Sequence, residues 1–166
     1  AFTETIPELS SPKDAYTLWA NRLPCPPLDL RQEQGVQRAC LEGIQRGLVR
    51  AAHDCSDGGL AVALAEMSFS SFHTTGCGAC INLPAGDFPP GVLFGEYQSR
   101  ILVTLEKTHW EELRKVAAKH GVELARLGTT GGTRLMVQGE GSVLIDEPVV
   151  ELESIWRHSL GQYFQR

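Results

Sequence analysis

The sequence lacks the features that mark nucleic-acid-binding and membrane proteins. It has 166 residues and a net charge of −5, and its Lys and Arg residues form no cluster of the kind that binds a phosphate backbone. No apolar run approaches the roughly 18 residues that cross a bilayer. The start, Ala1-Phe2-Thr3-Glu4, lacks the basic and apolar regions of a signal peptide. We therefore expect a cytoplasmic protein with no nucleic-acid and no membrane partner, although a piece of a longer chain would show no targeting signal either.

Cysteines occur without the spacing of a zinc site. There are five, and Cys77 and Cys80 form a C-x-x-C pattern that has no second pair at a suitable distance. The segment 77–83 is expected to be a strand, in which positions three apart face opposite sides of the sheet. Small buried thiols are therefore favoured over a redox or zinc motif, which stays the alternative.

Helical and strand patterns are mixed along the chain. The run Pro24-Cys25-Pro26-Pro27 separates an N-terminal arm and linker, 1–27, from a main domain, 28–166. The last strands follow one another directly, whereas doubly wound folds alternate strands and helices more strictly. We predict an α+β fold, a mixed β-sheet with packed α-helices. The expected helices are 12–23, 29–46, 58–69, 108–121 and one opening at Asp146, and the expected strands are 48–53, 77–83, 101–105, 122–127, 133–138 and 142–145.

Several local signals define the ends and faces of these helices. Asp29 is placed to cap the helix 29–46, and Gly47 to end it. A second capping pattern, Thr108 with Glu111, opens the helix 108–121. The helical spacing of four apolar residues predicts a buried stripe on the last helix: Leu152, Ile155, Trp156 and Leu160.

The most informative stretch is the predicted strand-to-helix turn at residues 53–60, His-Asp-Cys-Ser-Asp-Gly-Gly-Leu. Gly58 and Gly59 permit a sharp turn and a close approach by a ligand. Ser56 or Asp57 would serve as an ordinary N-cap, but Asp54 sits too early for that role. Two carboxylates repel a bare phosphate, whereas Mg²⁺ is commonly shared by carboxylate and phosphate oxygens. A nucleotide would therefore bind here only together with the metal.

A second polar cluster, 96–100, directly precedes the apolar strand 101–105. In extended backbone Glu96, Gln98 and Arg100 face the same way, so this row either holds a polar substrate or is an ordinary edge-strand surface. The glycine-rich segment 128–132 has no Lys of a phosphate-binding loop, and a tight turn between strands is the better interpretation.

These blocks resemble a known family. Residues 53–66, 93–103 and 127–132, and the ending 156–164, are similar to the C-terminal domain of the synthetase subunit of phosphoribosylformylglycinamidine synthase. The resemblance covers about 28–166. It implies the C-terminal-domain fold of the aminoimidazole-ribonucleotide-synthetase superfamily. It also implies an ATP-dependent ligase of purine biosynthesis that uses Mg²⁺ and converts formylglycinamide ribonucleotide, with glutamine-derived ammonia, to the amidine.

The resemblance also suggests site residues. The synthetase chain of that family is a tandem duplication with one catalytic and one auxiliary half-site. In its first-half copy, the residues matching Glu96, Tyr97 and Gln98 contact substrate, although that copy reads Glu-Ser-Gln and Tyr97 replaces the Ser here. This chain is more similar to the second-half copy, in which Asp54 would bind the metal and Ser56 the nucleotide. Implied partners are the remaining synthetase domains, a glutaminase subunit and a small accessory subunit.

Alternatives remain at this point. The domain could be architectural, without any ligand contact, or it could belong to a sister enzyme of the superfamily. In each case we expect the isolated chain to have no turnover, because no complete set of catalytic groups is found in it.

Overall fold

A computed structural model describes residues 28–71, 75–83 and 89–164. The expected helix 12–23 and the loop residue His73 lie outside these residues. The helices are α2 (Leu30–Gln45), α3 (Gly59–Ser68), α4 (Pro89–Phe94), the short 3₁₀ helix η1 (Lys107–His109), α5 (Trp110–Lys119) and α6 (Val149–Tyr163). The strands are β1 (Ala51–Asp54), β2 (Ala79–Asn82), β3 (Ile101–Thr104), β4 (Gly128–Thr130), β5 (Arg134–Gly139) and β6 (Ser142–Pro148).

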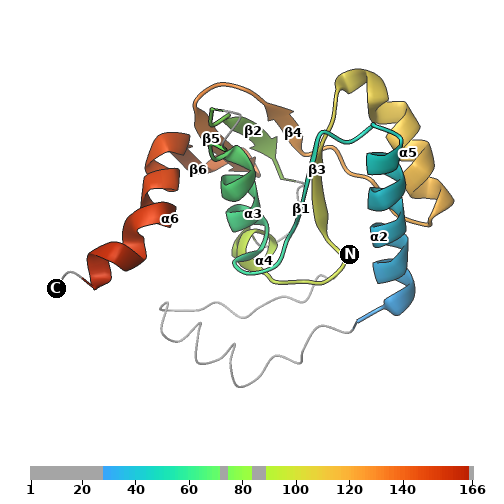
Figure 1. The fold of residues 1–166 in the computed structure, drawn as a ribbon, viewed down its shortest axis with the longest axis horizontal. Coiled ribbons are helices and arrows are strands. Elements are labelled where there is room, and N and C mark those ends of the chain that lie inside the picture. The colour runs from blue at the N-terminus through green and yellow to red at the C-terminus, as the bar shows by residue number, and fades with distance from the viewer. Residues whose placement is uncertain (1–27, 72–74, 84–88, 165–166) are drawn as a thin grey trace.

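The strands form two sheets with different surroundings. β1 and β3 pair antiparallel as a two-stranded sheet beside α2 and α5, and we call this half the helix-pair lobe (Figure 1). The other sheet has the order β4-β2-β5-β6, with β2 and β5 parallel and the other pairs antiparallel. Together with α3, α4 and α6 it makes up the sheet lobe. A mixed sheet with packed helices confirms the predicted α+β fold.

The sheet lobe contains the larger hydrophobic core. α3 is apolar on several sides and places Leu60, Ala63 and Leu64 on this core. The sheet contributes alternate residues of β5, and Leu135 and Val137 are fully buried. The core therefore lies between α3 and the four-stranded sheet.

The helix-pair lobe is packed through small residues. α2 begins after Asp29, whose Oδ1 accepts from the backbone N–H groups of Arg31 and Gln32, so the predicted cap is confirmed. Its buried face consists of Gly35, Val36, Ala39 and Gly43. At Gly43 a Cβ would come within 2.8 Å of Leu113 on α5. The close approach of the two helices therefore depends on a glycine.

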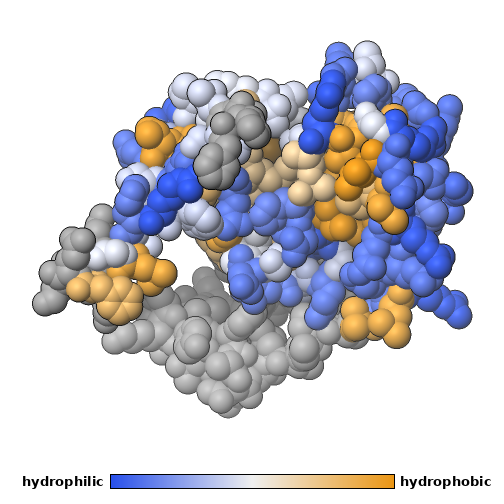
Figure 2. Space-filling view, viewed as in Figure 1, coloured by the Kyte–Doolittle hydropathy of each residue, from blue (hydrophilic) through white to orange (hydrophobic). Residues whose placement is uncertain are grey.

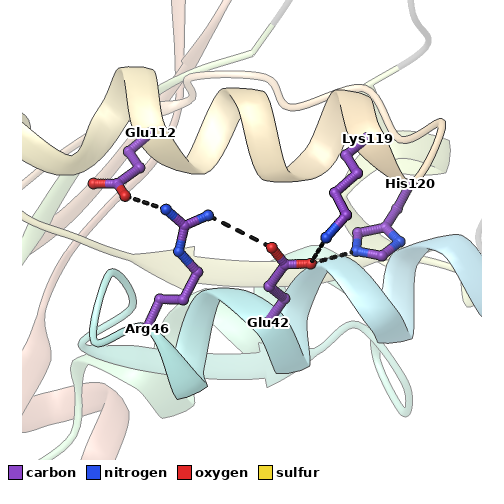
Figure 3. Close-up of polar contacts among 5 residues, drawn as sticks. All are labelled: Glu42, Arg46, Glu112, Lys119 and His120. Atoms are coloured by element: carbon purple, nitrogen blue, oxygen red, sulfur yellow. Dashed lines mark hydrogen bonds and ion pairs between the residues drawn. The ribbon is translucent and has the colours of Figure 1, made fainter.

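Charged side chains tie the same two helices together (Figure 3). Glu42 of α2 accepts from Lys119 Nζ and from His120 Nε2, each at 2.8 Å, at the end of α5. Arg46 Nη1 lies 3.5 Å from Glu42 Oε1, and Arg46 Nη2 donates to Glu112 Oε1. Because of the bonds from Lys119 and His120, the pKa of Glu42 is lowered to about 2.

Two strand predictions were wrong in part. The strand expected at 48–53 starts only at Ala51, and it is largely exposed rather than buried. It pairs with β3 alone among the described residues, so a single partner strand protects it. The segment 122–127 is not a strand, because its side chains are shared between the lobes: Leu124 packs on the helix-pair core and Leu127 on the sheet core.

The last helix also differs from the prediction. β6 extends through Pro148, so Asp146 is a strand residue, and its Oδ1 accepts from Arg134 Nε at 2.6 Å instead of capping a helix. Of the predicted stripe only Leu152 packs against the core. Ile155, Trp156 and Leu160 are exposed. No other part of the described chain covers the second half of α6.

Three smaller predictions need correction. The helix α4 was not among the expected helices, and it has Pro89 at its first position, where proline is well tolerated. Thr108 forms no cap, because it lies within η1, and α5 starts after His109 without a side-chain cap. Cys77 and Cys80 are exposed thiols rather than buried ones. Among the described helices, none combines the length and the apolar character that crossing a bilayer requires.

Candidate functional site

The two predicted polar clusters meet at the first turn of α3. Gly58 N donates to Glu96 Oε1 at 2.9 Å, and this bond joins residues 38 positions apart in the sequence. At Gly59 a Cβ would come within 2.8 Å of the Gly95 carbonyl oxygen and 2.9 Å of that of Leu93. Figure 1 shows α4 beside this turn. Glycine at position 59 therefore lets the chain that follows α4 lie directly against the start of α3.

Backbone interactions hold the turn between β1 and α3. Cys55 N donates to the Arg100 carbonyl oxygen at 3.0 Å, which continues the pairing of β1 with β3, and Gly59 N donates to the Ser56 carbonyl oxygen. Gly58 and Gly59 have φ values of +78° and +66°, a region that glycine enters without strain. The Cys55 side chain is buried, and burial raises the pKa of its thiol. The backbone of the turn is thus fixed.

The N-cap prediction for this helix was wrong. Gly58 is the N-cap residue, and no side chain of the turn caps the helix. Glu96 satisfies the Gly58 N–H from a distant loop instead, so Ser56 and Asp57 remain exposed. Ordinary capping therefore does not account for either residue.

Asp54 lies at the end of β1 with its carboxylate 72% exposed. Its neighbour His53 points toward α3, where its Nε2 lies 2.9 Å from Glu66 Oε2, and its Nδ1 lies 2.6 Å from the Asp54 carbonyl oxygen. The imidazole is therefore engaged in contacts with Glu66 and the backbone. The Asp54 carboxylate and the exposed Ser56 face solvent beside the start of α3.

The loop 95–100 is folded rather than extended. Ser99 has a φ of +62°, and its hydroxyl donates to Glu33 Oε2 on α2 at 2.7 Å. Arg100 donates to the carbonyl oxygens of Gly95 and Val92, at 3.4 and 3.3 Å. The expected row of Glu96, Gln98 and Arg100 on one side of an extended strand was therefore wrong. Arg100 and Ser99 shape the loop, a role that the local sequence did not indicate.

The predicted substrate residues are placed differently from one another. One carboxylate oxygen of Glu96 accepts from the backbone of the turn, whereas Tyr97 and Gln98 are exposed beside it. The structure thus brings Glu96 to the turn that carries Asp54 and Ser56. Their predicted roles toward metal, nucleotide and substrate stay predictions.

The residues of this turn carry donor atoms of the kinds that bind magnesium. Carboxylate and hydroxyl oxygens such as those of Asp54 and Ser56 are ligands of the type that Mg²⁺ takes. Within the described part of the chain, however, no three His, Cys, Asp or Glu side chains gather closely enough to hold a metal ion. The donor types fit the ion, but a complete site would need groups from elsewhere.

A cavity of about 920 Å³ opens between the two lobes. Its walls are mainly apolar and include Leu60, Leu102, Leu113 and Leu124. Asp54, Ser56, Glu96, Tyr97 and Gln98 do not line it. The turn thus contributes Cys55 and Leu60 to the wall of the cavity, but none of the predicted ligand residues.

Comparison with known families decides the classification. The family described as AIR synthase related protein, C-terminal domain, matches residues 15–138. The chain belongs to this family. As an AIR synthase related C-terminal domain it is 41% identical over 150 residues to the phosphoribosylformylglycinamidine synthase subunit PurL of Anaeromyxobacter dehalogenans, and the match covers 85% of this chain and 19% of that protein. The subunit PurL of Thermus thermophilus is 40% identical over 154 residues, 92% of this chain and 20% of its own length.

Solved structures show the same fold. PurL of Thermotoga maritima complexed with FGAR superposes with a TM-score of 0.63 at 23% identity, over 73% of this domain and 21% of that chain. PurLQS from the same organism gives a TM-score of 0.67 at 21% identity, over 81% of this domain and 24% of that chain. The same PurL has also been solved in complex with ATP. The chain spans about a fifth of the length of the curated relatives it matches.

Proposed function

We propose that this AIR synthase related domain is the C-terminal domain of the second-half copy in the synthetase subunit of a formylglycinamidine ribonucleotide synthase. The parent enzyme converts formylglycinamide ribonucleotide, ATP and glutamine-derived ammonia to the amidine, ADP and phosphate. The observation that carries this proposal is the identity of about 40% to subunit PurL over most of the chain. In this assignment residues 1–27 are the arm that links the domain 28–166 to the preceding part, and the enzyme is cytoplasmic.

Asp54 is the proposed metal residue and Ser56 the proposed nucleotide residue. The exposure of both supports this role, and so does the fixed backbone of the turn that presents them. When bound, Mg²⁺ would offset the repulsion between the carboxylates of this turn and nucleotide phosphates. The isolated domain supplies only part of the site, so the remaining ligands would come from another domain of the subunit.

Glu96, Tyr97 and Gln98 are proposed to face the substrate. Tyr97 and Gln98 are exposed next to the turn, and Glu96 fixes the turn through Gly58 N. Glu96 thereby links the substrate side of the site to its metal side. The glutaminase and small accessory subunits are proposed partners of the parent enzyme, a proposal that the PurLQS assembly of Thermotoga maritima supports by analogy.

The proposal is tested by assays for ATP hydrolysis and amidine formation. The 166-residue chain alone should show neither activity, and the complete synthetase polypeptide that contains it should show both. Measurable turnover by the chain alone would refute the division of the site between domains. Absence of amidine formation in the complete polypeptide, supplied with ammonia, Mg²⁺ and both substrates, would refute the assignment to this enzyme.

Asp54→Ala distinguishes this proposal from a purely architectural domain. In the complete polypeptide we expect it to lower the bound nucleotide content at least tenfold, as measured after gel filtration. Asp57→Ala is the matched control, because Asp57 is exposed in the same turn and has no assigned ligand. If the Asp54 variant keeps normal nucleotide content and normal stability, the architectural interpretation is correct. The architectural interpretation is supported by the absence of a complete group of metal ligands among the described residues.

A further inference from the structure

The feature that the proposed function does not use is the second half of α6. One stripe of this helix, Val149, Leu152, Trp156 and Leu160, has the spacing of residues that share a helical face. Val149 is only 4% exposed and Leu152 packs against the sheet core. Trp156 is 53% exposed and Leu160 is 73% exposed. The stripe therefore begins in the core and continues onto the surface, and its residues are apolar throughout.

The neighbouring side chains widen this surface. Ile155, one turn from Leu152, is 66% exposed. Figure 2 shows a hydrophobic patch where the last turns of α6 lie in Figure 1. We call Ile155, Trp156 and Leu160 the α6 patch.

The base of the α6 patch is fixed in place. Trp156 Nε1 donates to Glu66 Oε1 at 2.9 Å, and its ring lies 5.6 Å from that of Phe69. Arg157 donates to Glu153 Oε1 at 2.7 Å and to the Ser70 carbonyl oxygen. The hydroxyl and the backbone N–H of Ser70 also donate to Glu153. These bonds, followed by the bond from Arg157, lower the pKa of Glu153 to about 2, so the carboxylate stays charged in this arrangement. The helix is thus held as far as Arg157 and presents the turn beyond it, with Leu160, in a defined direction.

We propose that the α6 patch docks on another domain of the same synthetase polypeptide. This inference rests on the proposed function, because that function places the chain in a longer protein. Its first support is length: the curated relatives carry about four-fifths of their residues outside the part that matches this chain, which leaves an extensive surface available. Its second support is the continuity of the patch with the domain's own core, which suits burial against a second domain.

The charges near the patch disfavour other occupants. A membrane-surface helix carries several Lys or Arg residues on its polar face, whereas between Ile155 and Phe164 the only such residue is Arg157, which is paired with Glu153. A second copy of the chain would carry the same net charge of −5, and this overall like charge opposes self-association. An exposed Trp beside a paired Arg is typical of the centre of a protein interface.

Hydrogen exchange tests the docking directly. We expect the amides of residues 155–163 to exchange at least tenfold more slowly in the complete polypeptide than in the 166-residue chain. Leu160→Glu should abolish this difference, because a charge cannot be buried without a partner. Val143→Glu is the matched control, since Val143 is an exposed apolar residue of β6 outside the stripe and should leave the protection unchanged.

Two further measurements make each outcome decisive. Equal exchange in the chain and in the complete polypeptide would overturn the docking, and the amidine assay on the same sample would show whether the proposed function still stands. Sedimentation of the 166-residue chain checks the second copy: a dimer that Leu160→Glu converts to a monomer would overturn the proposal in favour of self-association. A monomer at all concentrations, with protection in the complete polypeptide, supports it. A thermal melt of the Leu160→Glu chain should match that of the unsubstituted chain, because the position is exposed.

Discussion

In the sheet lobe, Leu135 and Val137 are closed off from solvent by α3 and by the neighbouring strands, whereas in the helix-pair lobe charged residues line the contact between α2 and α5. The buried residues of the sheet-lobe core come from two strands (β2 and β5), two helices (α3 and α4) and the turn before α3. Among the described residues, the helix-pair core consists of Leu48, Leu113 and Val116 with a few half-buried neighbours. The cavity between the lobes borders the helix-pair core. We conclude that apolar burial stabilises the sheet lobe, while the helix-pair lobe depends more on ion pairs and on close approach at glycine.

The polar turn lies where these two lobes join. β1 belongs to the helix-pair lobe and α3 to the sheet lobe, and the turn that carries Asp54 and Ser56 connects them. Any loosening of one lobe against the other would therefore move the proposed metal and nucleotide residues relative to each other. The difference between the sheet lobe and the helix-pair lobe therefore bears on the proposed site, and the following predictions test that difference.

The largest expected effect comes from matched Leu→Ala substitutions in the two cores. Leu135→Ala should lower the free energy of unfolding by about 4 kcal/mol, because Leu135 is 1% exposed and leaves a closed cavity. Leu113→Ala should cost about 2 kcal/mol, since Leu113 borders the open cavity and its neighbours can relax into the space. Urea unfolding monitored by far-UV circular dichroism measures both.

The control for this pair is Val143→Ala on exposed β6, which should change the free energy of unfolding by less than about 0.5 kcal/mol. Equal losses for Leu135→Ala and Leu113→Ala would contradict the proposed difference between the lobes.

The next effect concerns the close approach of α4 to α3. Gly59→Ala should cost about 3 kcal/mol, because the new methyl group would meet the carbonyl oxygens of Leu93 and Gly95 and the residue would also keep a left-handed φ. Gly47→Ala shares a φ of +69° but has no atom within 4 Å of the added Cβ, so it should cost only about 1 kcal/mol. Thermal or urea unfolding of the two variants separates the cost of the left-handed backbone conformation from the cost of steric overlap with α4. Similar losses at both positions would mean that the contact with α4 is loose.

The smallest effect is a pH dependence confined to the helix-pair lobe. The folded-state pKa of Glu42 is lowered from its ordinary value of 4.5 to about 2, so its stabilising contribution is present above about pH 4.5 and disappears as the pH falls toward 2. Glu42→Gln should therefore speed hydrogen exchange in α2 and α5 at pH 5, and make much less difference at pH 2.5. Amides of β5 should respond little at either pH.

Glu111→Gln is the control for the pH experiment, because among the described residues Glu111 pairs only with Arg114, which lies on the same helix α5. It should leave exchange in α2 unchanged. A Glu42→Gln effect that is the same at pH 2.5 and pH 5 would show that the lowered pKa does not stabilise this lobe.

Much of the fold was predictable because its signals are local. Asp29 and Gly47 mark the ends of α2 through bonds and dihedral angles within a few residues, and both were identified correctly. The paired glycines 58 and 59 predicted the turn, and the direct succession of β5 and β6 predicted the mixed sheet. Asp146 shows the limit, because the same residue type that caps a helix also pairs with Arg134 across a strand.

The structure connects the predicted site residues through a bond that the sequence did not indicate. The sequence indicated Asp54, Ser56 and Glu96, yet nothing in it showed that Glu96 would accept from Gly58 N across 38 positions. Glu96, a residue of another loop, accepts from the start of α3 in place of the cap expected from Ser56 or Asp57. Such a bond depends on how α4 packs against α3, and no local sequence pattern predicts that packing.

By itself the sequence determined most of the described helices, the glycine turn before α3, the mixed α+β character and the stretches that resemble the synthetase family, because each depends on residues close together in the chain. Only the tertiary structure decided that the strands divide into two sheets and that Glu96 fixes the start of α3. It also decided that the apolar stripe of α6 leaves the core at Trp156 and Leu160. An apolar side chain favours burial wherever it occurs, but whether a neighbour is there to bury it depends on the packing of distant segments.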